Sequence, residues 1–154
     1  MELFKLDFDS VLRVGLHILV AFALALPIGW DRSQSARSVG LRTFPLVAIA
    51  SCGFILIGRG AFEPDTGPIA SVVQGLLSGI GFIGGGAILK GQTSVYGLAT
   101  AASIWNTAAI GAAIGFDQLE VGIILAAINL ALLRLLSPIA ESDFSDEPSD
   151  HSET

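Results

Sequence analysis

The chain has 154 residues, of which 52% are hydrophobic and 14% charged, and its net charge is −6 at pH 7. A soluble domain of this length could not bury so much apolar surface, and the acidic balance excludes a nucleic-acid-binding protein. Residues 66–89 and 91–116 are free of charge. Each run exceeds the roughly 20 residues that a helix needs to cross about 30 Å of hydrocarbon, which predicts a polytopic membrane protein.

The predicted fold is all-α, a membrane helix bundle with five crossings at residues 11–30, 44–58, 69–89, 95–114 and 119–136. The first apolar run could also be a signal peptide, with Ala23-Leu24-Ala25 as a cleavage site. The three acids before it argue against this, so we interpret it as a retained helix.

Two features of the predicted helices concern their ends. The second crossing is short, about 23 Å at 1.5 Å per residue, and is expected to thin the bilayer or to depend on Arg42 and Arg59 as flanking anchors. Ser137-Pro138 is expected to help terminate the fifth. Residues 1–140 would form the membrane domain, and the acidic, Ser-rich segment 141–154 a disordered tail.

Basic residues indicate the orientation, because they favour the cytoplasmic side. One predicted side carries Arg32, Arg37, Arg42, Lys90 and Arg134. The other carries Lys5, Arg13 and Arg59. This split predicts an outside N-terminus, and an Arg-rich loop and a C-terminus in the cytoplasm.

Glycines at positions 79, 81 and 84 spell G-x-G-x-x-G, the spacing of a dinucleotide-binding turn. The glycines lie inside an apolar run, however, and no carboxylate follows about 20 residues later, as that fold requires. Four-residue spacing instead puts small residues on one helix face, where backbones approach closely. The alternative is a flexible or broken helix that lines a polar cavity. The glycines in such pairs are Gly75, Gly79, Gly81, Gly85, Gly111 and Gly115.

Uncharged polar residues form stripes on the third and fourth predicted helices, and Asn129 lies midway along the fifth. Such groups either cross-link helices by hydrogen bonds or line a cytoplasm-facing pocket between helices three and four. The pocket candidates are Gln74, Ser78, Thr100, Ser103, Asn106 and Thr107.

No Asp or Glu lies in the middle of a predicted helix, although Mg²⁺ is normally held through one or two carboxylates. The nearest is Asp31, which could pair with Arg42 or cap the approach to the pocket. Asp31, Arg32, Arg42 and Thr43 are therefore a candidate cluster at the cytoplasmic edge, as a structural clamp or a ligand site. His17 is expected to be structural. We expect no catalytic set, metal site or cofactor.

Four ordered motifs resemble the MgtC/SapB family of bacterial inner-membrane proteins over residues 21–136. They are "LPIGWDRS", "SVGLRTFPLVAIAS", "SGIGFIGGGAIL" and "GLATAASIWNTAAIGAAIG". Ala99 and Asn106 differ from the Asn and Cys of virulence-type members, and a short acidic tail stands where many members have a folded C-terminal domain. Both departures argue against a virulence role.

The resemblance implies a non-enzymatic, multi-pass protein tied to growth at low Mg²⁺ and, in some members, to survival inside host cells. Such proteins resemble modulators of other membrane machinery, including ATP synthase, more than carriers of Mg²⁺. The expected partners are the lipid bilayer and another membrane protein, with a homo-oligomer as a further option. The alternative function is a small-solute or ion transporter or channel that uses the polar pocket.

Overall fold

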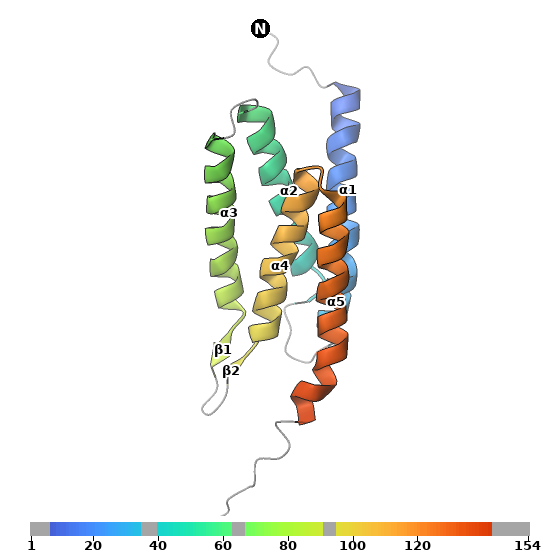
Figure 1. Cartoon of the computed structure of the whole chain (residues 1–154), viewed down its shortest axis with the longest axis vertical. Coiled ribbons are helices and arrows are strands. Elements are labelled where there is room, and N and C mark those ends of the chain that lie inside the picture. Colours follow the sequence, from blue (N-terminus) through green and yellow to red (C-terminus); the bar gives the residue numbers. More distant parts are fainter. Residues whose placement is uncertain (1–6, 35–39, 63–66, 91–94, 143–154) are drawn as a thin grey trace, which may run out of the picture.

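The computed structural model describes residues 7–34, 40–62, 67–90 and 95–142. Within these ranges it contains five helices and one pair of two-residue strands (Figure 1). The order is α1 (Phe8–Ser33), α2 (Thr43–Phe62), α3 (Gly67–Gly86), β1 (Leu89–Lys90), β2 (Val95–Tyr96), α4 (Leu98–Gly115) and α5 (Leu119–Ser142). Predictions for residues 143–154 lie outside the described residues.

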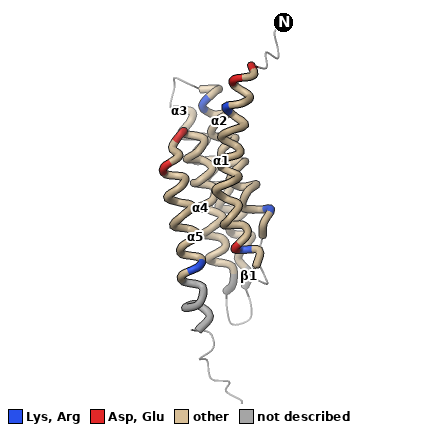
Figure 2. Tube along the Cα trace, turned by 90° about the vertical axis from the view of Figure 1, so that its right-hand side faces the viewer, with Lys and Arg blue, Asp and Glu red and all other residues tan. Residues whose placement is uncertain are grey.

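The helices run up and down beside one another (Figure 1). The start of α1 and the α4–α5 turn face the same way, which we call the upper end; the β1–β2 pair and the end of α5 face the lower end. Helices α1 to α4 are each long and apolar enough to span a membrane. Charged residues gather toward the helix ends (Figure 2). The predicted all-α membrane bundle is therefore confirmed.

Helix α4 occupies the centre of the bundle, where it contacts each of the other four helices. Its closest approach is to α2, at two glycines. A Cβ added to Gly111 would overlap the carbonyl oxygen of Ala48, and one added to Gly115 would lie 2.7 Å from the Cβ of Ile55. No real side chain tolerates such contacts, so glycine at these positions allows the two helix backbones to touch.

The short second crossing is a wrong prediction, because α2 continues to Phe62 and its 20 residues span about 30 Å. The prediction ended this helix at Gly58. In the structure Gly58 is buried, a Cβ added to it would lie 3.4 Å from Val72 of α3, and Arg59 in the last turn bonds across the bundle to Gly115. These tertiary contacts stabilise a turn that glycine weakens locally.

The fifth helix also continues past its predicted end, through Pro138 to Ser142. A proline removes one backbone donor and displaces the helix at the preceding turn. Near a helix end that emerges from the membrane, water can bond to the freed carbonyl group, which reduces the cost.

The connection between the third and fourth helices differs from the prediction, which extended both helices into it. Helix α3 ends at Gly86, in a run of three glycines with low helix propensity. Leu89 then pairs with Tyr96, and Lys90 with Val95, as antiparallel strands. Gly97, which precedes α4, has φ of +88°, and a Cβ there would overlap the carbonyl oxygen of Ala87. The turn therefore requires glycine.

Substitution of Gly111 tests the α2–α4 contact. We expect Gly111→Ala to lower the free energy of unfolding by about 1–3 kcal/mol, the usual cost of overpacking, because the methyl group would overlap Ala48. Unfolding in mixed detergent micelles measures the change. Gly79→Ala is the control, since nothing lies within 4 Å of a Cβ added there. Equal stability of the two variants would contradict the assigned contact.

Candidate functional site

The predicted cytoplasmic cluster is partly assembled at the lower end, with a different partner for Asp31. Its Oδ1 accepts a hydrogen bond from Arg134 Nε of α5 at 3.3 Å, and its Oδ2 accepts one from Arg32 Nη2 at 3.1 Å. Arg42 is exposed in the turn before α2. The predicted Asp31–Arg42 pair is thus replaced by a clamp between α1 and α5, which we call the lower clamp (Asp31, Arg32 and Arg134).

Thr43 begins α2, and its backbone N–H donates to the carbonyl oxygen of Gly40 at 3.0 Å. Its side chain lines a largely apolar cavity of about 720 Å³ between α2 and α3. Gly75 and Gly79 also line this cavity, together with Ser51. None of the six polar pocket candidates lines it, and it lies between α2 and α3, rather than between α3 and α4.

The polar side chains of α4 are used in bonds within the bundle. Ser103 Oγ donates to Asn129 Oδ1 of α5 at 3.0 Å, and Asn106 Nδ2 donates to the Leu125 carbonyl of α5 at 3.2 Å. Thr107 Oγ1 donates to the Ser103 carbonyl at 2.7 Å. Two of these three bonds therefore join α4 to α5, as expected if the polar residues cross-link helices. Thr100, also on α4, is buried.

The polar residues of α3 lie apart from those of α4. Ser71, Gln74 and Ser78 are exposed. Only 11% of the apolar stretch of α3 is buried, compared with 56% for α4. Nothing lies within 4 Å of a Cβ added to any of the four paired glycines of this helix, Gly75, Gly79, Gly81 and Gly85. The close packing expected there is absent within the described chain, because α3 lies at the outside of the bundle (Figure 1).

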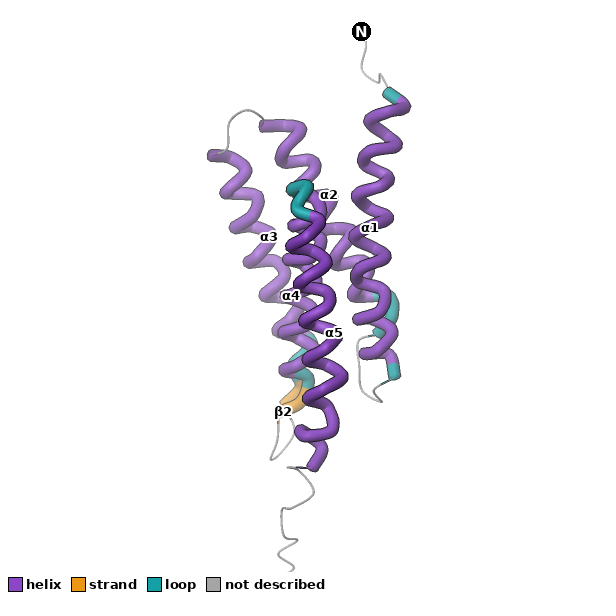
Figure 3. Tube along the Cα trace, turned by 45° about the vertical axis from the view of Figure 1, so that its right-hand side comes forward, coloured by secondary structure: helices purple, strands orange, loops and turns teal. Residues whose placement is uncertain are grey.

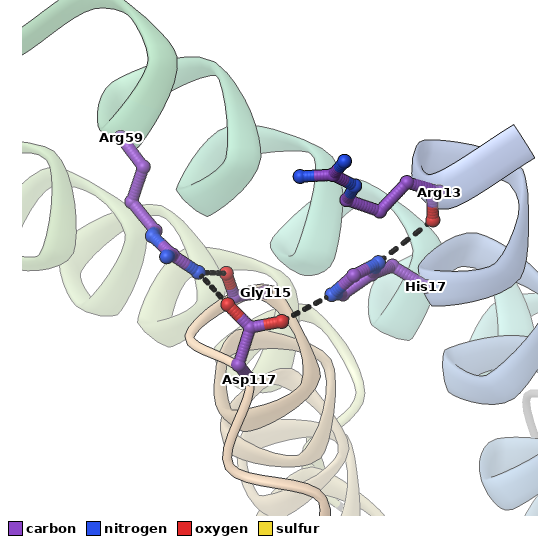
Figure 4. Close-up of polar contacts among 5 residues, drawn as sticks. All are labelled: Arg13, His17, Arg59, Gly115 and Asp117. Carbon is purple, nitrogen blue, oxygen red and sulfur yellow. Dashed lines mark hydrogen bonds and ion pairs between the residues drawn. The ribbon is translucent and has the colours of Figure 1, made fainter. Parts of the chain in front are cut away.

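A second group of charged residues, which we call the upper cluster (Arg13, His17, Arg59 and Asp117), joins three parts of the chain at the upper end (Figure 4). Asp117 Oδ1 lies 2.7 Å from His17 Nε2 of α1. Asp117 Oδ2 accepts a short hydrogen bond from Arg59 Nη1 of α2. The same Arg59 nitrogen donates to the Gly115 carbonyl at 3.0 Å.

Local backbone structure explains how Asp117 reaches both partners. The N–H of Gln118 donates to the Ala113 carbonyl at 2.9 Å, and that of Asp117 to the Ile114 carbonyl at 3.0 Å. This is a Schellman motif, which places the residue after the C-cap in the left-handed region. Asp117 has φ of +60° there, where glycine is usual. The carboxylate also lies at the negative end of the helix dipole, an unfavourable position that Arg59 offsets.

The hydrogen-bonding groups around His17 indicate which protonation state of its imidazole ring they favour. Its Nδ1 lies 2.8 Å from the Arg13 carbonyl, and its Nε2 faces the Asp117 carboxylate. Both groups are acceptors, so a ring with protons on both nitrogens satisfies them. The hydrogen bond from Arg59, followed by that from His17, holds the pKa of Asp117 below its ordinary value of 3.8.

Sequence reasoning missed the upper cluster. His17 and Asp117 are 100 residues apart, and no spacing rule connects them. The one available signal was a lone histidine on an apolar helix, together with a lone aspartate in a short loop, since buried polar groups usually have partners. The structural role predicted for His17 agrees with its place in this cluster.

The sequence matches the MgtC family model over residues 18–142. The chain belongs to the MgtC family. It is 36% identical over 126 residues to SrpB of Synechococcus elongatus, with 73% of this chain and 69% of SrpB covered. It is 36% identical over 127 residues to YhiD of Escherichia coli K12, with 77% of this chain and 57% of YhiD covered.

The similarity extends to MgtC of Salmonella typhimurium LT2, at 36% identity over 136 residues and 86% of this chain. The match covers 58% of MgtC, so this MgtC-family chain spans little more than half the length of MgtC and YhiD. No solved structure matches the chain. The family assignment agrees with the apolar helices and supports a membrane protein.

Removal of the Asp117 carboxylate tests the upper cluster. We expect Asp117→Asn to lower the melting temperature at pH 7, by the equivalent of about 0.2–1 kcal/mol per partly exposed ion pair. Because the folded-state pKa is lowered, this stabilisation is present above the ordinary pKa of 3.8 and is lost as the pH falls through the folded-state value. The difference between wild type and Asp117→Asn should therefore shrink in acid.

Melting curves between pH 7 and pH 3 in detergent measure this difference. Glu120→Gln is the matched control, because Glu120 is an exposed carboxylate in the first turn of α5. A difference between Asp117→Asn and wild type that stays constant over the whole pH range would contradict the ionic role.

Proposed function

We propose that this MgtC-family protein is a non-enzymatic, multi-pass protein of the bacterial inner membrane that modulates other membrane machinery during Mg²⁺ limitation or related stress. Family membership supports the membrane setting, and the name of the relative YhiD, a provisional magnesium transporter, supports a link to magnesium physiology. The predicted orientation, with the N-terminus outside, belongs to this proposal. One structural observation carries the modulator role: the uncovered outer face of α3.

The outer face of α3 presents groups that hydrocarbon solvates poorly. Gln74 and Ser78 are exposed, and Gly81 and Gly85 on the same face leave the helix backbone accessible. A polar group in an apolar medium costs free energy unless it forms a hydrogen bond. Small residues and hydrogen-bonding side chains are also what transmembrane helices use to contact one another. A helix of a partner membrane protein would satisfy both requirements.

The partner, in this proposal, is another membrane protein, of which ATP synthase is the example that the family resemblance offers. A second copy of this chain would meet the same face by the same chemistry, since glycine pairs with four-residue spacing also join identical helices. Cross-linking from α3 followed by mass measurement separates these two outcomes.

Bulky substitutions on α3 test the proposal without disturbing the fold. Gly81→Leu places a side chain where nothing lies within 4 Å, so we expect normal membrane levels and melting. The partner contact should be lost, which would be measured as loss of the cross-link and of growth at low Mg²⁺. Gly15→Leu on α1 is the matched control, because its surroundings are equally open. Full growth and cross-linking of Gly81→Leu would overturn the α3 contact.

A second candidate function is transport of a small solute, and one observation favours it. The buried Ser51 hydroxyl has no hydrogen-bond partner among the described residues, and it lines the cavity between α2 and α3. YhiD is named, provisionally, as a magnesium transporter. Saturable flux into proteoliposomes that is reduced by Ser51→Ala would replace the modulator role with this one.

Substitution of two arginines at the lower end, Arg42 and Arg134, distinguishes a binding role from a structural role for Arg42. Arg134 bonds to Asp31, so Arg134→Ala should lower stability, by up to about 1 kcal/mol for a partly exposed pair. Arg42 is exposed, and Arg42→Ala should leave the melting temperature unchanged. Loss of growth at low Mg²⁺ in Arg42→Ala at normal protein levels would assign Arg42 to a contact with the partner. Equal loss of protein in both variants would show that Arg42 also supports the fold.

A further inference from the structure

The upper cluster lies in a recess of the bundle. The α4–α5 turn, which carries Asp117, ends below the upper ends of α1, α2 and α3 (Figures 1 and 3). Helices α1 and α2 therefore rise beside the turn and hold Arg13 and Arg59 around it (Figure 4). Because charged groups are costly in hydrocarbon, we infer that this recess opens to the polar boundary of the membrane, within reach of lipid headgroups.

The charges in this recess are not balanced among the residues that line it. Arg13 and Arg59 line the recess with one carboxylate, that of Asp117. Both carboxylate oxygens are already bonded, to His17 and to Arg59. Asp9, one turn before Arg13, is exposed and does not line the recess. The positive charge of Arg13 therefore has no carboxylate partner among the residues that line the recess, and it favours an anion.

Arg13 supplies the group that is available to such an anion. Its guanidinium extends from α1 toward the side of α2 on which Arg59 lies, past the His17 ring (Figure 4). It makes no side-chain bond with any described residue, whereas its backbone carbonyl faces His17 Nδ1. An arginine fork binds phosphate oxygens in two parallel hydrogen bonds, so phosphate is the anion that fits it best.

A cavity of about 150 Å³ lies against these groups and accommodates a phosphate group. It is lined by Arg13, Val14, His17, Leu56, Arg59 and Asp117. On the other side of the His17–Asp117 pair lies a second cavity of about 220 Å³. Its remaining lining is apolar: Leu16, Val20, Ile114 and Leu119. A polar compartment with cations therefore adjoins an apolar one between α1 and the start of α5.

We propose that this recess binds the phosphate group of an anionic phospholipid. The phosphate group lies in the 150 Å³ cavity and bonds to Arg13, and the apolar part of the lipid follows Val14, Leu56 and the outer surface of α1. Free inorganic phosphate shares the headgroup chemistry, but it would leave the adjoining apolar walls unused. The lipid thereby bridges α1 and α2 above the α4–α5 turn. This inference does not depend on the proposed function.

Thermal unfolding of the purified full-length chain in detergent tests the site at constant ionic strength. The probes are dihexanoyl phosphatidylglycerol, dihexanoyl phosphatidylcholine and inorganic phosphate. At a concentration well above Kd, linkage predicts an increase of several degrees in melting temperature. We expect this increase with phosphatidylglycerol for wild type, and a smaller one for Arg13→Lys, which keeps the charge but lacks the fork. We expect little or none for Arg13→Gln, and the full increase for Arg134→Gln, which removes a charge at the lower end.

Comparison of the three probes distinguishes a phospholipid headgroup from free phosphate as the ligand. An equal increase with inorganic phosphate, again lost in Arg13→Gln, would assign the site to free phosphate and overturn the lipid. An equal increase with phosphatidylcholine would show that lipid binding ignores net charge, and would overturn the anionic preference. No increase with any probe, or the same increase in Arg13→Gln as in wild type, would overturn the site itself. Arg13→Gln should fold, because the Arg13 side chain is exposed.

Discussion

The contact between the backbones of α2 and α4 at Gly111 and Gly115 is the constraint on which the rest of the structure depends. It fixes α4 at the centre, so that α1, α3 and α5 pack around a pair of helices that touch. It also brings the C-terminal end of α4 under the last turn of α2. Arg59 reaches the Gly115 carbonyl and Asp117 for that reason, so the upper cluster is a consequence of the glycine contact.

The polar groups divide according to their distance from this central pair. Ser103, Asn106 and Thr107 on α4 bond inside the bundle, where an unsatisfied group would be costly. Gln74 and Ser78 on α3 lie outside it and are exposed. The inner set holds the helices together. The outer set is where, in the proposed function, a partner helix would bond.

The sequence was sufficient for the features that depend on local composition. Uncharged apolar runs located the helices, and the spacing of Gly111 and Gly115 indicated close packing, because both signals reflect what hydrocarbon excludes. The same spacing at Gly75 and Gly79 could not show which face of α3 was covered. The ends of α2 and the pairing of Asp31 with Arg134 depend on contacts between distant segments. No local pattern records such contacts, and the upper cluster was missed for this reason.

The unusual residue in the turn after α4 has a mechanical consequence. Because the carboxylate of Asp117 bonds to α1 through His17 and to α2 through Arg59, those two helices cannot slide along α4 without breaking a bond at this point. The turn therefore keeps the upper parts of α1, α2 and α4 in register with one another. The side chains of this cluster come from α1, α2 and the α4–α5 turn, and none of them comes from α3.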